Sequence, residues 1–199
     1  MKTYTLDDVR ELVDKYEGDI VNFGAEDDED NETDDLVIEK AEKALGLQFT
    51  ISYKVFLKKY GGGEIGGEEI YSLYGDCGEG IPAGDIVYRN LIDRRDGFTT
   101  PEQLVVSYDL DETFYFDYTQ FRDGECPLYV RFADEECEYY ASNFYEFLCK
   151  RIKVHAGEDI EQVYVGDETG HEKTEQTPPP QPLPFYKSLW KKLWRRDNS

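Results

Sequence analysis

The sequence has little positive charge and no long apolar run. Lys and Arg number 22 against 44 Asp and Glu, which gives a formal net charge of −22. Such an acidic surface repels nucleic-acid phosphates, so DNA and RNA are excluded as partners of the main body. No apolar stretch approaches the roughly 20 residues of a membrane-spanning helix, and the N-terminus MKTYTLDDVRELVDKY lacks the apolar core of a signal peptide. These absences indicate a cytoplasmic protein.

Cysteine and histidine are also scarce. The four cysteines are Cys77, Cys126, Cys137 and Cys149, and none forms a Cys-x-x-Cys pair. Reduced structural thiols are therefore favoured over disulfides or a metal site. The two histidines, His155 and His171, fall in a stretch predicted to be a linker, where neither is placed to activate a nucleophile. The sequence predicts no catalytic residue, cofactor or metal ligand, and an enzyme is the least favoured class.

The pattern around residues 34–61 predicts two short helices that fold back on each other. The first begins at Asp34 or Asp35 and ends at Gly46, and its apolar residues recur at helical spacing. The second has Ser52 as its expected N-cap and carries a stripe rich in Tyr and Phe. Gly61 supplies the left-handed residue that ends it.

The block LGLQFTISYKVFLKKYGGG at 45–63 resembles the signature of the SUKH superfamily, which contains bacterial toxin-immunity proteins and fungal cell-wall-synthesis regulators. The family pattern is a helix ending in LGL, a linker usually carrying Leu-Pro, and a Tyr-containing helix that ends in glycines. Phe49-Thr50 replaces the Leu-Pro here. The segments DIVYRNLIDRR at 85–95 and SNFYEFLCKRI at 142–152 also resemble the family, in the same order. The resemblance covers roughly 34–153 and implies a domain that binds other proteins.

The whole pattern predicts an α+β fold, with a mixed, mainly antiparallel sheet and packed helices of the SUKH kind. A helix at 5–17 opens with a capping box formed by Thr5 and Asp8. Ser142 is the expected cap of the last helix. Between them the alternation of apolar residues predicts a hairpin at 64–74, a helix at 85–95 and strands at 104–109, 114–118, 128–132 and 138–141.

Four parts are expected along the chain: an N-terminal helix and acidic loop at 1–33, a SUKH-like domain at 34–153, a polar and Pro-rich linker at 154–184, and a basic amphipathic tail at 185–199. Residues 25–35 hold eight carboxylates and are expected to form a flexible acidic loop. Their spacing lacks the central glycine and terminal Glu of a calcium loop, so calcium binding is not expected there.

The tail, FYKSLWKKLWRR, carries a charge of +4 over 185–199 and leaves −26 on the rest of the chain. Its predicted amphipathic helix is typical of anchors that lie on an anionic membrane surface. The residues expected to bind the membrane are Phe185, Leu189, Trp190, Lys191, Lys192, Leu193, Trp194 and Arg195. Such binding would place the protein at the inner face of the membrane. Two other interpretations are that the tail docks on its own acidic domain or on a partner.

By resemblance, the first functional hypothesis is an immunity protein that neutralises a cognate toxin, one with a basic surface such as a nuclease, of a polymorphic toxin or contact-dependent inhibition system. The acids expected to meet it are Glu64, Glu68, Glu69, Asp76, Glu79, Asp109, Asp111 and Glu112. Tyr115, Tyr129 and Tyr139 are further candidates, because Tyr is enriched at interface hot spots. Alternatives are a regulatory scaffold recruited to membranes by the tail and an acidic mimic of nucleic acid. The acidity has a simpler interpretation as well, namely solubility.

Overall fold

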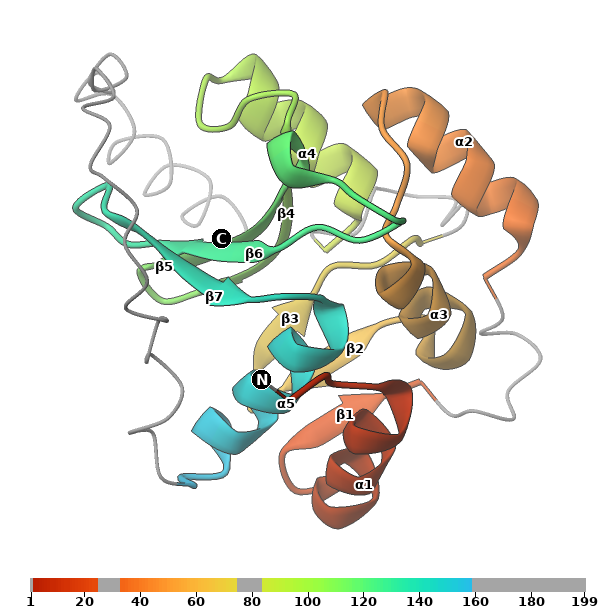
Figure 1. Ribbon diagram of the computed structural model, residues 1–199, viewed down its shortest axis with the longest axis vertical. Helices are drawn as coiled ribbons and strands as arrows, with labels where there is room; N and C mark the ends of the chain where they lie inside the picture. Colours follow the sequence, from red (N-terminus) through yellow and green to blue (C-terminus); the bar gives the residue numbers. More distant parts are fainter. Residues whose placement is uncertain (1, 25–32, 75–83, 159–199) are drawn as a thin grey trace, which may run out of the picture. The chain divides into compact units, whose positions relative to one another are not determined.

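The structure is a computed structural model, which describes residues 2–24, 33–74 and 84–158 (Figure 1). These residues form five α-helices and seven strands. In chain order they are α1 (Leu6–Tyr16), β1 (Val21–Phe23), α2 (Asp35–Leu45), α3 (Ile51–Tyr60), β2 (Gly63–Ile65), β3 (Glu68–Ile70), α4 (Ile86–Arg95), β4 (Gln103–Asp109), β5 (Glu112–Asp117), β6 (Leu128–Arg131), β7 (Cys137–Ala141) and α5 (Phe144–His155). The tail, most of the segment 154–184 predicted to be a linker, and most of the acidic loop lie outside the described residues.

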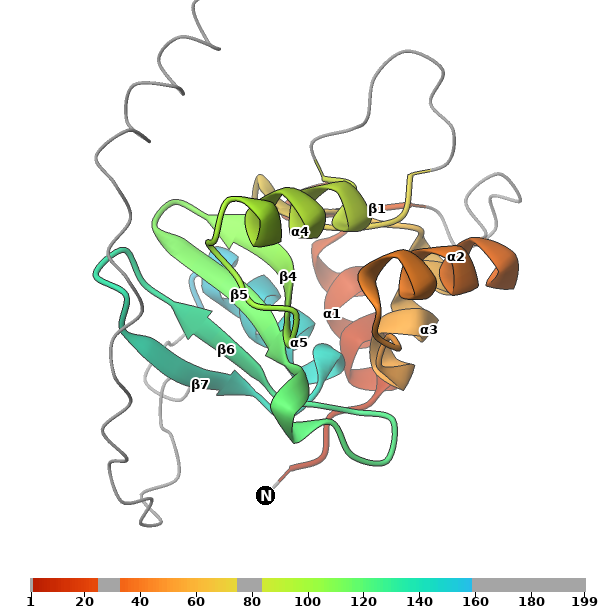
Figure 2. The same cartoon turned by 90° about the horizontal axis from the view of Figure 1, so that it is seen from above.

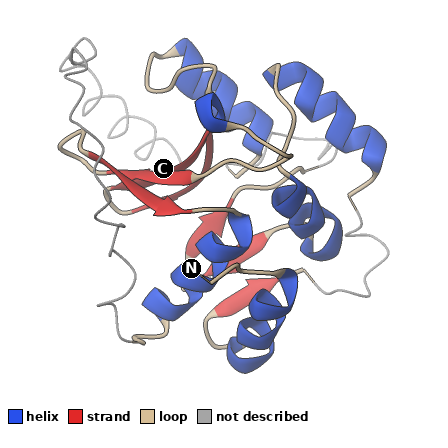
Figure 3. Cartoon of the chain, viewed as in Figure 1, coloured by secondary structure: helices blue, strands red, loops and turns tan. Residues whose placement is uncertain are grey.

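The strands, drawn red in Figure 3, form one sheet in the order β1-β2-β3-β4-β5-β6-β7, so each strand pairs with its neighbours along the chain. Every pairing between these strands is antiparallel. Parallel contacts occur in this part of the chain only as isolated bridges, such as that between Ser72 and Asp85. The predicted α+β fold with a mainly antiparallel sheet is therefore confirmed.

Helices lie on both faces of the sheet. On one face α5 packs against the strands, and α1 packs against α5; α4 lies over β4 on the opposite face (Figure 2). Aromatic rings fill the layer between α5, α3 and the sheet. Tyr53 of α3 lies 4.9 Å from Phe144 and 6.0 Å from Phe116 between ring centroids, in edge-to-face contacts. Such pairs add about 0.5–1.5 kcal/mol each beyond the area they bury.

The pairing between β3 and β4 is short: Ile70 lies opposite Ser107, and the Tyr71 N–H donates to the Val106 carbonyl oxygen at 2.8 Å. The helix α4 supplies the next contact. The fully buried Asn90 of α4 donates its Nδ2 to the carbonyl oxygen of Val105 at 2.9 Å, and its Oδ1 accepts the N–H of Val105 at 2.8 Å. A side-chain amide thus replaces the missing strand partner, as a buried backbone requires. Asn90 thereby ties α4 to β4.

The helix ends are set largely as the sequence predicts. The N–H and Oγ1 of Thr5 both donate to Asp8 Oδ2, at 2.8 and 2.9 Å. The side chain of Asp34 caps α2, and Gly46 ends it with φ at 72°. The left-handed Gly61 likewise ends α3. These predictions are confirmed, and they show that local cap chemistry decides where the helices begin and end.

The two predicted serine caps are wrong. Thr50, not Ser52, caps α3 and accepts the N–H of Tyr53, while Ser52 is buried in the first turn. In α5 the cap is Asn143, whose side chain accepts the N–H of Glu146 at 2.9 Å. In both cases a neighbouring residue with an extended backbone holds the cap position. Ser52 is used instead to bind Glu125, to which its N–H and Oγ donate at 2.7 Å each.

The N-terminal segment is part of the sheet and the core. Val9 of α1 is fully buried, and β1, which the sequence does not reveal, pairs with β2. The third glycine of the GGG triplet makes this pairing fit. Gly63 has φ at 142°, and a Cβ there would lie 2.3 Å from the carbonyl oxygen of Asn22 in β1. The glycine therefore permits the close approach of two backbones.

Candidate functional site

A buried arginine collects three of the acids that the sequence singles out. The Arg151 side chain in α5 is only 1% exposed. Its Nε donates to Glu68 Oε2 of β3 at 2.6 Å, and its Nη2 donates to Asp109 Oδ2 of β4 at 2.7 Å. Its Nη1 lies 3.4 Å from Glu112 Oε2 of β5. We call this group, with His155, the Arg151 cluster. One guanidinium thereby joins α5 to three strands.

The remaining contacts of the cluster satisfy its buried oxygens. Ser107 Oγ donates to Glu68 Oε1 at 2.6 Å, and His155 Nε2 lies 3.0 Å from Glu68 Oε2. The guanidinium also lies 4.5 Å from the centroid of the Phe114 ring. Burial alone lowers the pKa of Arg151, but the Glu68 carboxylate overcomes this and raises the pKa above its ordinary value. Arg151 therefore stays charged, and its partners compensate it.

The cluster has one arrangement of metal-ligand type, but the arginine already uses it. Ligand atoms of Glu68, Asp109 and His155 lie within 4.8 Å of one another. The oxygens of Glu68 and Asp109 nearest His155 are the same atoms that bind the Arg151 guanidinium. A cation placed among them would face the positive charge of the arginine at close range. We therefore interpret the cluster as an ionic clamp that stabilises the fold.

The structure divides the eight acids proposed for partner binding. Glu68 is 2% exposed, so the expectation that it lies on the surface is wrong: it faces the core beside Ile70 and compensates Arg151. The side chains of Asp109 and Glu112 are 25% exposed and hold the same arginine. Of the remaining members of the eight, Glu64 and Asp111 are exposed and Glu69 is half-buried. Asp76 and Glu79 lie outside the described residues.

Two of the surface acids lie directly opposite each other. Glu64 of β2 pairs with Glu69 of β3 across the hairpin. Like charges in this position destabilise a sheet, and here neighbouring polar groups partly compensate them. Asn22 Nδ2 lies 3.5 Å from Glu64 Oε1, and the hydroxyl of Tyr74 donates to Glu69 Oε1 at 3.2 Å. A cationic group of a partner would relieve the remaining repulsion.

Tyr115, Tyr129 and Tyr139 form a row across β5, β6 and β7, on the face opposite α5; we call it the tyrosine row. Tyr115 and Tyr129 are stacked at 6.2 Å, and Tyr129 meets Tyr139 edge-on at 5.9 Å. Exposure increases along the row, from 6% at Tyr115 to 38% at Tyr139. Arg131 covers the Tyr115 ring and donates to the carbonyl oxygen of Phe98. The ring of Tyr139, at the β7 end of the row, is thus accessible.

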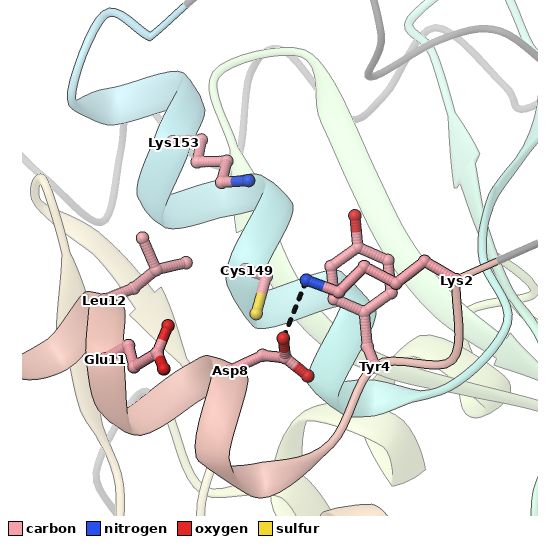
Figure 4. Close-up of a pocket in the computed structure, with 7 residues that line it drawn as sticks. All are labelled: Lys2, Tyr4, Asp8, Glu11, Leu12, Cys149 and Lys153. Carbon is pink, nitrogen blue, oxygen red and sulfur yellow. Dashed lines mark ion pairs between the residues drawn. The ribbon is translucent and has the colours of Figure 1, made fainter.

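A shallow hollow between α1 and α5 offers no comparable chemistry. It is lined by Lys2, Tyr4, Asp8, Glu11, Leu12, Cys149 and Lys153 (Figure 4). Lys2 Nζ lies 2.7 Å from Asp8 Oδ1, and this contact lowers the pKa of Asp8 to about 2. Burial raises the pKa of the Cys149 thiol to about 12, so the thiol is protonated and unreactive at neutral pH. The hollow contains paired charges and an inert thiol.

Sequence reasoning missed Arg151 and misplaced His155. His155 belongs to the last turn of α5 and not to a linker. A signal was present: Arg151 lies seven residues after Phe144, on the same helical stripe as Phe147 and Leu148. A charged residue on a buried stripe requires a charged partner, but the helical pattern does not identify which residue that partner is.

The fold and its surface define an α+β domain built on an antiparallel sheet, with acidic and aromatic groups exposed at its strands. A family model described as SMI1-KNR4 cell-wall, of the SUKH group, matches residues 35–148, which is more than half of the chain. The chain therefore belongs to the SUKH family. No curated protein matches it. SUKH proteins are in general non-enzymatic immunity or regulatory proteins. In the described residues no helix is long and apolar enough to cross a membrane.

Proposed function

We propose that this protein is an immunity protein, which binds a cognate protein toxin with a basic surface and neutralises it. The observation that carries the proposal is its membership of the SUKH family, which includes toxin-immunity proteins. A net charge of −22 supports a basic partner. Opposite charge raises the rate of encounter and suppresses binding to acidic competitors.

The exposed acids provide contacts that such a partner would use. Glu64 and Glu69 face each other on the hairpin, and Asp111 lies in the exposed turn between β4 and β5. A Lys or Arg placed between Glu64 and Glu69 would convert a repulsive pair into two attractive ones. Catalysis finds no support in the Arg151 cluster, where the acids are used by the arginine.

Co-expression tests the proposal. The toxic domain encoded by the adjacent gene is induced in cells with and without this chain. We expect growth to recover only with the chain, and the two purified proteins to co-elute from a sizing column. Raising the salt concentration should slow association more than dissociation, because screening acts chiefly on steering. Unchanged toxicity together with separate elution would refute the proposal.

A regulatory scaffold recruited to membranes is the second candidate, and the tail at 185–199 favours it. The segment places five cations beside two tryptophans. Each cation near an anionic leaflet contributes about 1 kcal/mol. Co-sedimentation with vesicles of 30% phosphatidylserine, for the full chain and for a chain ending at residue 184, tests this. A matched control changes Trp190 and Trp194 to Ala and keeps the charge. Equal sedimentation of all three would exclude this function.

A further inference from the structure

The sheet has two edge strands in the described part of the chain, β1 and β7, and β7 is the longer, with 5 residues against 3. On the short strand β1, the Val21 carbonyl oxygen already accepts the Gly18 N–H of the preceding turn at 3.0 Å. Strand β7 has β6 as its single neighbouring strand in the described part of the chain. Its residues Cys137, Glu138 and Tyr139 are all exposed. An exposed edge is a template on which another strand can pair.

The register identifies the backbone groups that face outward. The Phe132 N–H donates to the Glu136 carbonyl oxygen at 2.9 Å, which makes this the first hydrogen-bonded pair of the β6–β7 hairpin. Bonded and non-bonded pairs alternate in an antiparallel ladder, so Cys137 and Tyr139 occupy non-bonded pairs with β6. Their N–H and C=O groups therefore point away from β6, toward the open edge. Two residues thus offer four outward backbone groups.

The side chains beside this edge set the chemistry of a partner. Four of the five residues 134–138 are acidic, with Cys137 as the exception. Tyr139 of the tyrosine row lies next to them, 38% exposed. A second copy of this chain would bring an equally acidic edge, and like charges would oppose the pairing. A strand that carries Lys or Arg would gain both ion pairs and a cation–π contact with the Tyr139 ring.

We propose that β7 is the docking edge for the partner, and that an extended basic segment of that protein pairs with it as an eighth strand. The inference rests on the proposed function, since it gives the basic partner its binding surface. In this mode backbone bonds to Cys137 and Tyr139 provide affinity. The acids of 134–138 and the tyrosine row select a cationic, partly aromatic or aliphatic sequence.

Two pairs of variants test the edge, with the adjacent gene's toxic domain as the probe. Cys137→Pro removes an outward N–H without removing a bond to β6, and proline is tolerated at such edge positions. Its matched control is Cys137→Ser, which keeps the N–H. Glu138→Lys reverses a charge at the edge. Its control is Glu39→Lys, which makes the same change of net charge on an exposed position of α2.

We expect Cys137→Pro and Glu138→Lys each to raise the dissociation constant by about tenfold or more, and both controls to change it by less than about threefold. Amide hydrogen exchange at Cys137 and Tyr139 should slow in the complex. If both edge variants bind as tightly as their controls, the edge proposal is overturned and the proposed function stands. If the unaltered chain forms no complex with the toxic domain, both fall. Because Glu138→Lys does not alter the backbone, it decides the question even if Cys137→Pro is unstable.

Discussion

Replacing Arg151 with Met should be among the most damaging single changes in the described part of the chain. It leaves the Glu68 carboxylate, which is fully buried, without its main partner, and it removes the cation shared with Asp109 and Glu112. Removing one member of a buried ion pair destabilises proteins by about 3–5 kcal/mol. A domain is stable by about 5–15 kcal/mol in total. We therefore expect the Tm to fall by roughly 6–20 °C.

Urea unfolding followed by circular dichroism measures this loss. Lys153→Met is the matched control, since it removes the same charge from the same helix at a half-buried position; we expect less than about 1 kcal/mol there. Adding Glu68→Gln to Arg151→Met should recover part of the loss, because the buried uncompensated charge disappears. A loss below about 1 kcal/mol for Arg151→Met would refute the interpretation of the cluster as a clamp.

Three further predictions concern separate parts of the fold. Gly63→Ala should destabilise the protein by more than about 1 kcal/mol in the same urea assay, because the added Cβ collides with the β1 backbone. Burial raises the pKa of Glu125, so the free energy of unfolding of the parent should fall as the carboxyl ionises above about pH 4. Glu125→Gln cannot ionise, so its free energy of unfolding should rise relative to that of the parent between about pH 4 and 7. A difference between the two proteins that stays constant with pH would contradict this. With Cys77 replaced by Ser, Cys137 should react with a thiol reagent at pH 8, whereas Cys126 and Cys149, whose pKa values burial raises to about 12, should react only on unfolding.

Local chemistry explains what could be predicted about the fold. The strands of the second half can be predicted from the alternation of apolar residues. Phe114 and Phe116, for example, are both fully buried and are separated by a residue on the opposite face. Glycines at helix ends are equally informative, since Gly46 and Gly61 both adopt the left-handed conformation. The strand β1 could not be predicted, because three residues carry no period and their partner, β2, lies about forty positions further on.

The surface acids were harder to judge than the elements. Glu68 and Arg151 are 83 residues apart, and no local pattern connects them. The period of two does place Glu68 on the same face as the buried Ile70, a signal that the abundance of carboxylates in this chain conceals. Contacts between residues far apart in the sequence therefore decide which acids stabilise the fold and which remain at the surface.

The packing of α5 on the sheet has a consequence for the synthesis of the protein. Each strand pairs with a neighbour in the chain, so the sheet can form progressively as the chain emerges, whereas the sheet face under α5 stays uncovered until residues 144–155 are made. Premature termination or cleavage before Phe144 would leave that apolar face open and three carboxylates without their arginine. Such fragments should be removed by proteolysis, so that only a chain complete through α5 accumulates.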